Sequence, residues 1–182
     1  NGGETWQTGA LPCEEVQYGY PQDWDSRSIY LLGEQDTWLI CGGDAESAMR
    51  LANKWLYYSP DDGQNWQLLI NASLEGFRSG GSVLASGLWP DLFFLDKQHG
   101  WIGTFSALFR TQDGGLTWET LRDPNFDITF ANPQFFNLQE GIISWSTGGE
   151  DYILRTLDGG ETWQPIYPPP LPHIIQFMDA QN

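Results

Sequence analysis

Thr111-Gln-Asp113-Gly-Gly115-Leu-Thr-Trp118 is one of three copies of the pattern Ser/Thr-x-Asp-x-Gly-x-x-Trp in this chain. The others are Ser59-Pro-Asp61-Asp-Gly63-Gln-Asn-Trp66 and Thr156-Leu-Asp158-Gly-Gly160-Glu-Thr-Trp163, and a copy without its first half opens the chain as Asn1-Gly-Gly3-Glu-Thr-Trp6. The closing Trp residues recur at intervals of about 45 to 60 residues, which is typical of one four-stranded propeller blade per interval. The motif therefore predicts a repeat architecture.

A second pattern supports this interpretation. It precedes each copy of the Ser/Thr-x-Asp-x-Gly-x-x-Trp motif, which we call the box. Tyr30–Trp38 aligns with Phe93–Trp101, and Phe135–Ile142 occupies the same register, while Phe177–Asn182 begins the pattern once more. Between these landmarks lie short runs rich in aromatic and β-branched residues and bounded by Gly, Asp and Pro. We therefore predict an all-β chain, a β-propeller of four-stranded antiparallel blades.

The expected strands can be placed from these runs. In the three repeats they are Ser28–Leu32, Trp38–Gly42, Trp55–Ser59 and Asn65–Ile70; Leu92–Leu95, Trp101–Phe105, Ala107–Thr111 and Leu116–Leu121; and Gln134–Asn137, Gly141–Ser146, Tyr152–Thr156 and Glu161–Ile166. The sequence indicates no helix apart from a single turn within Asp44–Asn53.

The repeats span residues 7–70, 71–121 and 122–166 of a single propeller region, 1–182, with partial blade strands at 1–6 and 174–182. Three blades and loose strands would leave open sheet edges, which proteins avoid. We therefore expect a partial propeller, either a piece of a larger ring or one whose copies associate to complete it.

The box itself has a structural interpretation. Its Asp can accept hydrogen bonds from backbone N–H groups of its own turn, its Gly supplies a positive φ, its hydroxyl caps the turn, and its Trp packs on a neighbouring blade. A catalytic carboxylate or a calcium ligand is the competing interpretation, but an identical set in every blade favours a scaffold. The structural positions are Ser59, Asp61, Gly63, Trp66, Thr111, Asp113, Gly115, Trp118, Thr156, Asp158, Gly160 and Trp163.

The charge balance limits the partners. Eight Lys and Arg residues stand against 24 Asp and Glu, a formal net charge of −16. This charge disfavours nucleic acid and anionic membranes and suits basic peptides, cations or neutral glycans. Cys13 and Cys41 can form one disulfide or remain two buried thiols, and Asn71-Ala-Ser73 fits a glycosylation sequon. Both features favour a periplasmic, lumenal or secreted protein.

At the boxes the chain resembles the Asp-box, or bacterial neuraminidase repeat, superfamily. The fuller pattern, a Phe-rich strand, then Gly-Trp, then Thr-x-Asp-Gly-Gly-x-Thr-Trp, most resembles the photosystem II stability/assembly factor-like propellers. Leu92–Leu121 and Gln134–Ile166 carry it best, and Ser28–Ile70 more loosely. The resemblance implies that Asp61, Asp113 and Asp158 are turn scaffolding away from the ligand site, and it implies a role in assembling a membrane-protein complex.

Strand parity locates the expected binding face. The boxes follow the third strand of each repeat, whereas the segments of irregular length follow the second or fourth: 7–27, 43–54, 71–91, 122–133 and 167–173. Length variation gathered on one face is how propellers build binding sites. We expect the partner to contact Tyr18, Tyr20, Trp24, Phe77, Arg78, Trp89, Arg122 and Tyr167.

The residues do not point to a catalytic site. No pair of carboxylates has a spacing that singles it out for glycoside hydrolysis, and His99 and His173 lack metal-ligand spacing, so neither a metal nor a cofactor is expected. We therefore predict a non-enzymatic binding or assembly scaffold that recognises a protein partner through the face opposite the boxes. The alternative is a glycan-active module, either a lectin or a piece of an Asp-box glycoside hydrolase.

Overall fold

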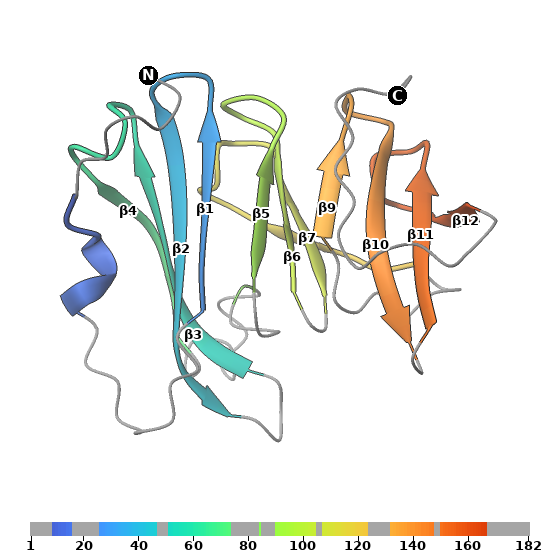
Figure 1. The fold of residues 1–182 in the computed structure, drawn as a ribbon, viewed down its shortest axis with the longest axis horizontal. Coiled ribbons are helices and arrows are strands. Elements are labelled where there is room, and N and C mark those ends of the chain that lie inside the picture. The colour runs from blue at the N-terminus through green and yellow to red at the C-terminus, as the bar shows by residue number, and fades with distance from the viewer. Residues whose placement is uncertain are drawn as a thin grey trace, which may run out of the picture.

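The computed structural model describes residues 9–15, 26–46, 51–73, 84, 90–104, 107–123, 132–147 and 150–166. Twelve strands form three four-stranded antiparallel sheets, here called blades A, B and C (Figure 1). Blade A contains β1 (Ser26–Leu32), β2 (Asp36–Glu46), β3 (Leu51–Ser59) and β4 (Gln67–Ala72). Blade B contains β5 (Asp91–Phe94), β6 (Gly100–Gly103), β7 (Leu108–Thr111) and β8 (Glu119–Leu121). Blade C contains β9 (Asn132–Phe135), β10 (Gly141–Thr147), β11 (Glu150–Thr156) and β12 (Gln164–Ile166).

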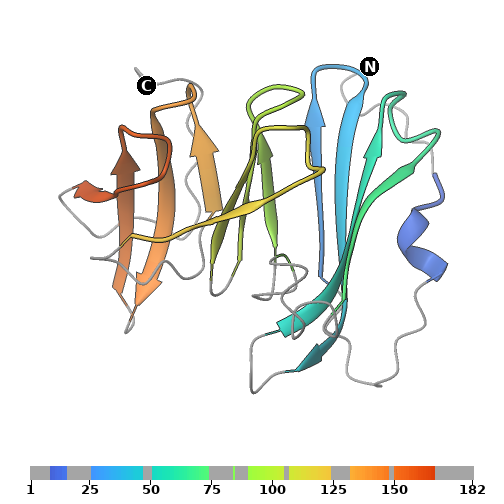
Figure 2. The same ribbon diagram turned by 180° about the vertical axis from the view of Figure 1, so that it is seen from behind.

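The blades are arranged as in a propeller. Each sheet has its strands in sequence order, and β5 contacts both β1 and β9, so the first strand of every blade lies on the inner side (Figure 2). Two apolar clusters fill the spaces between the blades. The described chain is thus all-β, apart from one short 3₁₀ helix, and is a partial propeller as the sequence predicts.

An aromatic trio is built at each blade interface. Trp38 of blade A stacks on Phe94 of blade B with ring centroids 3.9 Å apart, and Phe94 meets the box residue Trp118 edge-on at 6.2 Å. The next interface repeats the arrangement: Trp101 stacks on Phe135 at 3.6 Å, and Phe135 meets Trp163 edge-on at 6.2 Å. Stacked and edge-to-face rings both suit the aromatic quadrupole, so Trp118 and Trp163 each help to join two blades. The expectation is wrong for the third box Trp, Trp66, which packs in a cluster within blade A and its 3₁₀ helix.

A glycine makes room for the central ring of each trio. Gly100 lies directly opposite Phe94 in the ladder, and Gly141 lies opposite Phe135. A Cβ at either glycine would lie 2.6 Å from ring atoms of its Phe, which is closer than van der Waals contact permits. The Phe–Gly pair therefore lets the ring lie flat across the neighbouring strand.

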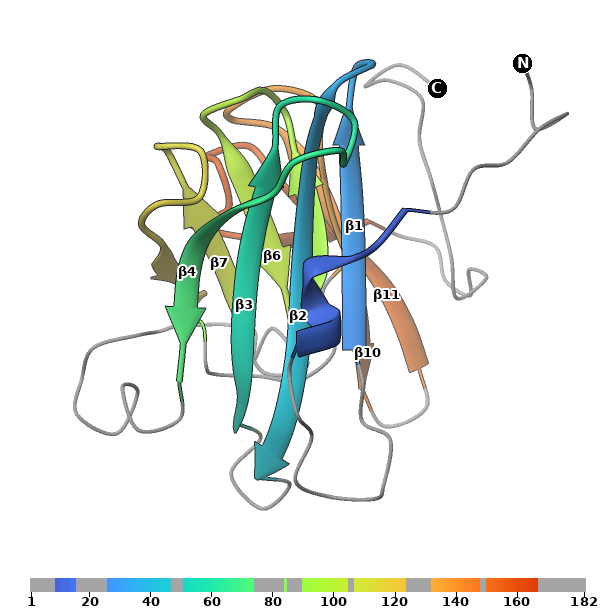
Figure 3. The same cartoon turned by 90° about the vertical axis from the view of Figure 1, so that its left-hand side faces the viewer.

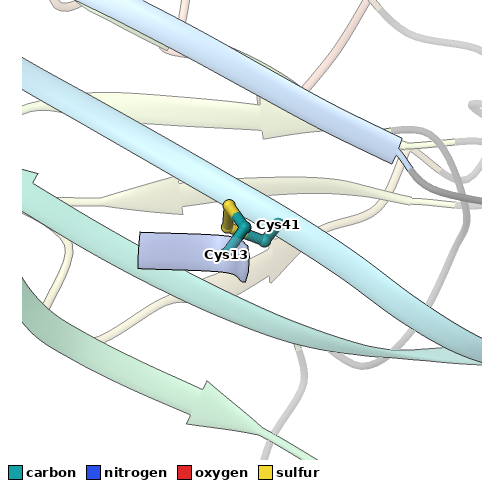
Figure 4. The surroundings of a disulfide bond; sticks show 2 residues. All are labelled: Cys13 and Cys41. Atoms are coloured by element: carbon teal, nitrogen blue, oxygen red, sulfur yellow. A yellow bond between two sulfur atoms is a disulfide. The ribbon is translucent and has the colours of Figure 1, made fainter. Parts of the chain in front are cut away.

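Blade A departs from this pattern on its outward face. The equivalent cross-strand pair is Leu31–Thr37, and Leu31 is 52% exposed. Over β2 and β3, this face is covered by a 3₁₀ helix, η1 (Pro12–Glu15), which the Cys13–Cys41 disulfide fastens to β2 (Figures 3 and 4). The covered residues include Leu39, Trp55, Tyr57 and Trp66.

Several expected boundaries were wrong. Residues 43–54 were expected to be irregular with a possible helical turn, but β2 extends through Glu46 and β3 begins at Leu51. Their extra pairs include Ala45–Ala52, and a β-bulge between Gly43 and Ala45 absorbs the offset. A 3₁₀ helix also stands within the segment 7–27, where no helix was expected. The partial strands expected at 1–6 and 174–182 lie outside the described residues.

Candidate functional site

The Asp box of blade B forms a closed network inside its own turn. The Thr111 hydroxyl donates to Oδ1 of Asp113 at 2.9 Å and accepts a hydrogen bond from the N–H of Gly115 at 3.0 Å. Oδ1 of Asp113 also accepts the Thr117 N–H at 2.9 Å, and Oδ2 accepts the Thr117 hydroxyl at 2.6 Å. Both carboxylate oxygens are therefore engaged by the turn that carries them.

The other two boxes repeat this network. Asp158 is held by Thr156 and Thr162, and Asp61 is held by Ser59 and Asn65. Burial alone would raise the pKa of Asp113 and Asp158, but the hydrogen bonds they accept outweigh it, so each pKa lies below its usual value. For Asp61 the hydrogen bonds from the Asn65 side chain and backbone lower the pKa most strongly. All three groups are poorly suited to take up a proton near neutral pH.

The box turns lie at one end of the blades, together with the loops after the first strands (Figure 2). In every blade the box donates a backbone N–H to that loop: Asp62 to Gln35 O, Gly114 to Gln98 O and Gly159 to Gln139 O, at 2.8–2.9 Å. We call this end the box side. Its loops are tied to one another by main-chain hydrogen bonds, as expected of a structural rim.

Polar contacts on the box side also join neighbouring blades. Between blades A and B, Asp36 is buried and accepts from Lys97 at 2.8 Å and from the Tyr58 hydroxyl at 2.5 Å. Burial and the Asp36 carboxylate raise the pKa of Tyr58 to about 12. Trp38 Nε1 donates to Gly114 O of blade B at 3.1 Å.

A different side chain makes the corresponding contact between blades B and C. Arg110 occupies the strand position of Tyr58. Its guanidinium donates to Glu119 of its own blade at 2.8 Å, and to Gly159 O at 3.1 Å and Glu161 at 2.8 Å in blade C. The cross-blade partner of Arg110 had no signal in the sequence.

Little of the expected binding face falls within the described residues. Arg122 directly follows β8 and its side chain is exposed. The adjacent Asp123 is buried and accepts the Trp163 N–H of blade C at 2.6 Å, so it joins the two blades. The remaining candidates, Tyr18, Tyr20, Trp24, Phe77, Arg78, Trp89 and Tyr167, lie outside the described residues.

Sequence reasoning did not single out Lys54. This residue of β3 is only 1% exposed, and burial lowers its pKa to about 7. It lies opposite Gly42 and Ala72 in the sheet of blade A. The alternation of apolar residues in β3 could have indicated that Lys54 shares the inward face of Leu56.

Among the residues that the structure describes, no group of three or more His, Cys, Asp or Glu side chains could hold a metal ion. None of the described helices is long and apolar enough to cross a membrane.

The comparisons with known proteins decide the family. The sequence model of the family described as "Photosynthesis system II assembly factor YCF48" matches residues 82–173, half of the chain. The chain belongs to this family. The match runs through blades B and C, which carry the two Phe–Gly pairs and the two Asp-Gly-Gly boxes of the described chain. A comparison with curated protein sequences finds no significant match.

A solved structure has the same fold. It is described as "YCF48 bound to D1 peptide", is 19% identical and superposes with a TM-score of 0.54 over 82% of this chain. The chain spans 42% of the length of that protein. At this identity the likeness concerns the fold, and the shared architecture is an Asp-box propeller.

Proposed function

We propose that this chain is a non-enzymatic scaffold that binds a protein segment on the side of the propeller opposite the Asp boxes. The observation that carries the proposal is that the polar side chains of the box side bind within the propeller itself. The Asp carboxylates of the boxes are engaged within their own turns, and each box is hydrogen-bonded to the neighbouring loop of its own blade. Lys97 and Arg110 pair with carboxylates of neighbouring blades. We therefore assign partner recognition to the irregular segments on the other side.

The proposed contacts are the residues that strand parity assigns to that side: Tyr18, Tyr20, Trp24, Phe77, Arg78, Trp89, Arg122 and Tyr167. Aromatic and Arg side chains are the usual anchors of protein recognition. Arg122, the one described member, is exposed and follows a residue that is 4% exposed, Leu121, so its backbone is held by the blade while its side chain is available.

The chemistry of the partner follows from charge and family. A net charge of −16 favours a segment with basic or neutral side chains over an acidic one. The family of assembly factors and the solved relative bound to a D1 peptide support a peptide segment of a protein under assembly. The glycan-active alternative gains nothing from the family match.

An oxidising compartment suits this role. The Cys13–Cys41 disulfide holds η1 on blade A, and disulfides form and persist in secreted, periplasmic and comparable settings. We therefore propose that the chain functions outside the cytoplasm.

Fluorescence anisotropy with a labelled D1 peptide and a scrambled peptide of the same composition tests the proposal. The D1 peptide should bind more tightly, and Arg122→Ala should weaken binding by roughly tenfold if Arg122 is an anchor. Arg155→Ala is the matched control, because this exposed Arg lies on the box side of blade C. An equal loss of peptide affinity in both variants, or a loss only in Arg155→Ala, would contradict the proposal, because it would indicate binding on the box side.

A further inference from the structure

The first strands of the three blades carry a polar residue at the same ladder position, toward the end of the strand that lies away from the boxes. The residues are Ser28, Asp91 and Asn132, and their partners in the second strands are Ile40, Gly103 and Ser144. The strand β5 lies between β1 and β9 and contacts both (Figure 1). The three polar residues therefore form a row on the inner side of the propeller, on the side opposite the boxes.

Only one member of this row helps to join the blades. The Ser28 hydroxyl accepts a hydrogen bond from the N–H of Leu92 in blade B at 3.2 Å. Asp91 and Asn132 are exposed, and within the part of the chain that the structure describes neither side chain makes a hydrogen bond or an ion pair. Asp91 thus differs from the three box aspartates, whose carboxylates are all bonded within their own turns.

The surroundings of Asp91 leave its carboxylate reachable but poorly hydrated. Gly103, directly opposite in the ladder, has no side chain to cover it. Leu92, the next residue, is 8% exposed and packs in the cluster between blades A and B, so strand alternation places Asp91 on the other face of β5 with Phe93. The Phe93 ring lies 6.4 Å from that of Phe135 in blade C. Protein around the carboxyl group takes the place of water and raises the pKa of Asp91.

This state favours pairing with a cation. A carboxylate that the fold has already withdrawn from water loses less hydration when it forms an ion pair than one in bulk solvent does. A divalent metal ion would require further ligands, and among the described residues no group of three or more His, Cys, Asp or Glu side chains could hold one. A single Arg or Lys side chain needs only one carboxylate, and the net charge of −16 attracts it.

We propose that Asp91 is the anchor for a basic side chain, Arg or Lys, of the protein segment that binds on the side opposite the boxes. The inference rests on the proposed function and names one contact within it. Blade B lies between blades A and C, so the anchor stands at the inner strand of a blade with both neighbours in place. It selects for charge at one position of the bound segment, in addition to the general attraction that the acidic chain exerts at every position.

Fluorescence anisotropy with a scan of labelled D1 peptides tests this contact. Each peptide carries one Lys, or one Glu, at each position in turn. At one position the native chain should bind the Lys peptide roughly tenfold more tightly than the Glu peptide, beyond the preference at the other positions. Asp91→Asn should remove this excess. Asp91→Lys should reverse it, so that the Glu peptide binds more tightly at that position, a gain that an unfolded variant could not produce.

Glu34→Lys is the matched control, because it makes the same change of charge at an exposed position on the box side of blade A. It should weaken the Lys peptides slightly and equally at all positions. Peptides that bind the native chain with a charge preference that Asp91→Lys leaves unchanged, or that Glu34→Lys alters equally, overturn the inference while the proposed function stands. A native chain that binds no peptide of the scan contradicts the proposed function, and the inference falls with it.

Discussion

The Phe94–Gly100 pair allows the clearest test of how the blades pack. Gly100→Ala places a methyl group 2.6 Å from two carbons of the Phe94 ring. The ring cannot retreat, because Trp38 stacks on it at 3.9 Å. Overpacking costs about 1–3 kcal/mol, and displacing a stacked ring forfeits about 0.5–1.5 kcal/mol more, so the free energy of unfolding should fall by about 2–4 kcal/mol. At a position where alanine fits without strain, Gly→Ala is mildly stabilising, because it restricts the conformations of the unfolded chain.

Urea unfolding followed by circular dichroism measures this loss. Gly9→Ala is the control, since a Cβ there meets nothing within 4 Å. A double-mutant cycle then tests the pairing itself, because Phe94→Leu with Gly100→Thr recreates the Leu31–Thr37 pair that blade A uses at the same ladder position. The double variant should lose at least about 1 kcal/mol less than the sum of the single losses. Additive losses, or a Gly100→Ala variant as stable as the native chain, would refute this account of the interface.

Three further predictions concern stability. The folded-state pKa of Asp113 is depressed, so its contribution is fully present above about pH 4 and is lost as pH falls through the folded pKa. Asp113→Asn should therefore lower the urea midpoint at pH 7, and this difference from the native chain should shrink as the pH falls below about 4. The pKa of Lys54 is lowered to about 7 in the folded chain, so stability should rise from about pH 7 to 10.5, and a Lys54→Met variant that keeps this rise in its unfolding curves would contradict the assignment. Reduction of Cys13–Cys41, which are separated by 28 residues, should lower the free energy of unfolding by roughly 3–4 kcal/mol, and melting temperatures that are the same with and without reductant would count against it.

The sequence predicts the repeat and most strand positions because each box closes a turn through its own side chains. It places the start of the outer strands too early, at Leu116 and Glu161, whereas β8 begins at Glu119 and β12 at Gln164. The physical reason lies in the turn. The N–H groups of Thr117 and Thr162 bond to the box carboxylates and are unavailable to a neighbouring strand.

Contacts between blades are harder to predict. Trp38 donates to Gly114, and Arg110 donates to Glu161, across long stretches of chain. These partners depend on the angle between two sheets, which no local pattern encodes. The polar partners also differ between the interfaces: Lys97 of blade B pairs with Asp36 of blade A, whereas Arg110 of blade B pairs with Glu161 of blade C. The side of the binding face can be proposed from strand parity, but its individual contacts cannot.

Photo-crosslinking of a D1 peptide to the intact chain, with the linked residues identified by mass spectrometry, tests the central claim most directly. The account predicts crosslinks in the irregular segments 7–27, 71–91, 122–133 and 167–173, with few in the three boxes. Crosslinks concentrated at Ser59–Trp66, Thr111–Trp118 or Thr156–Trp163 would contradict it, because they would place the partner on the side that we assign to scaffolding.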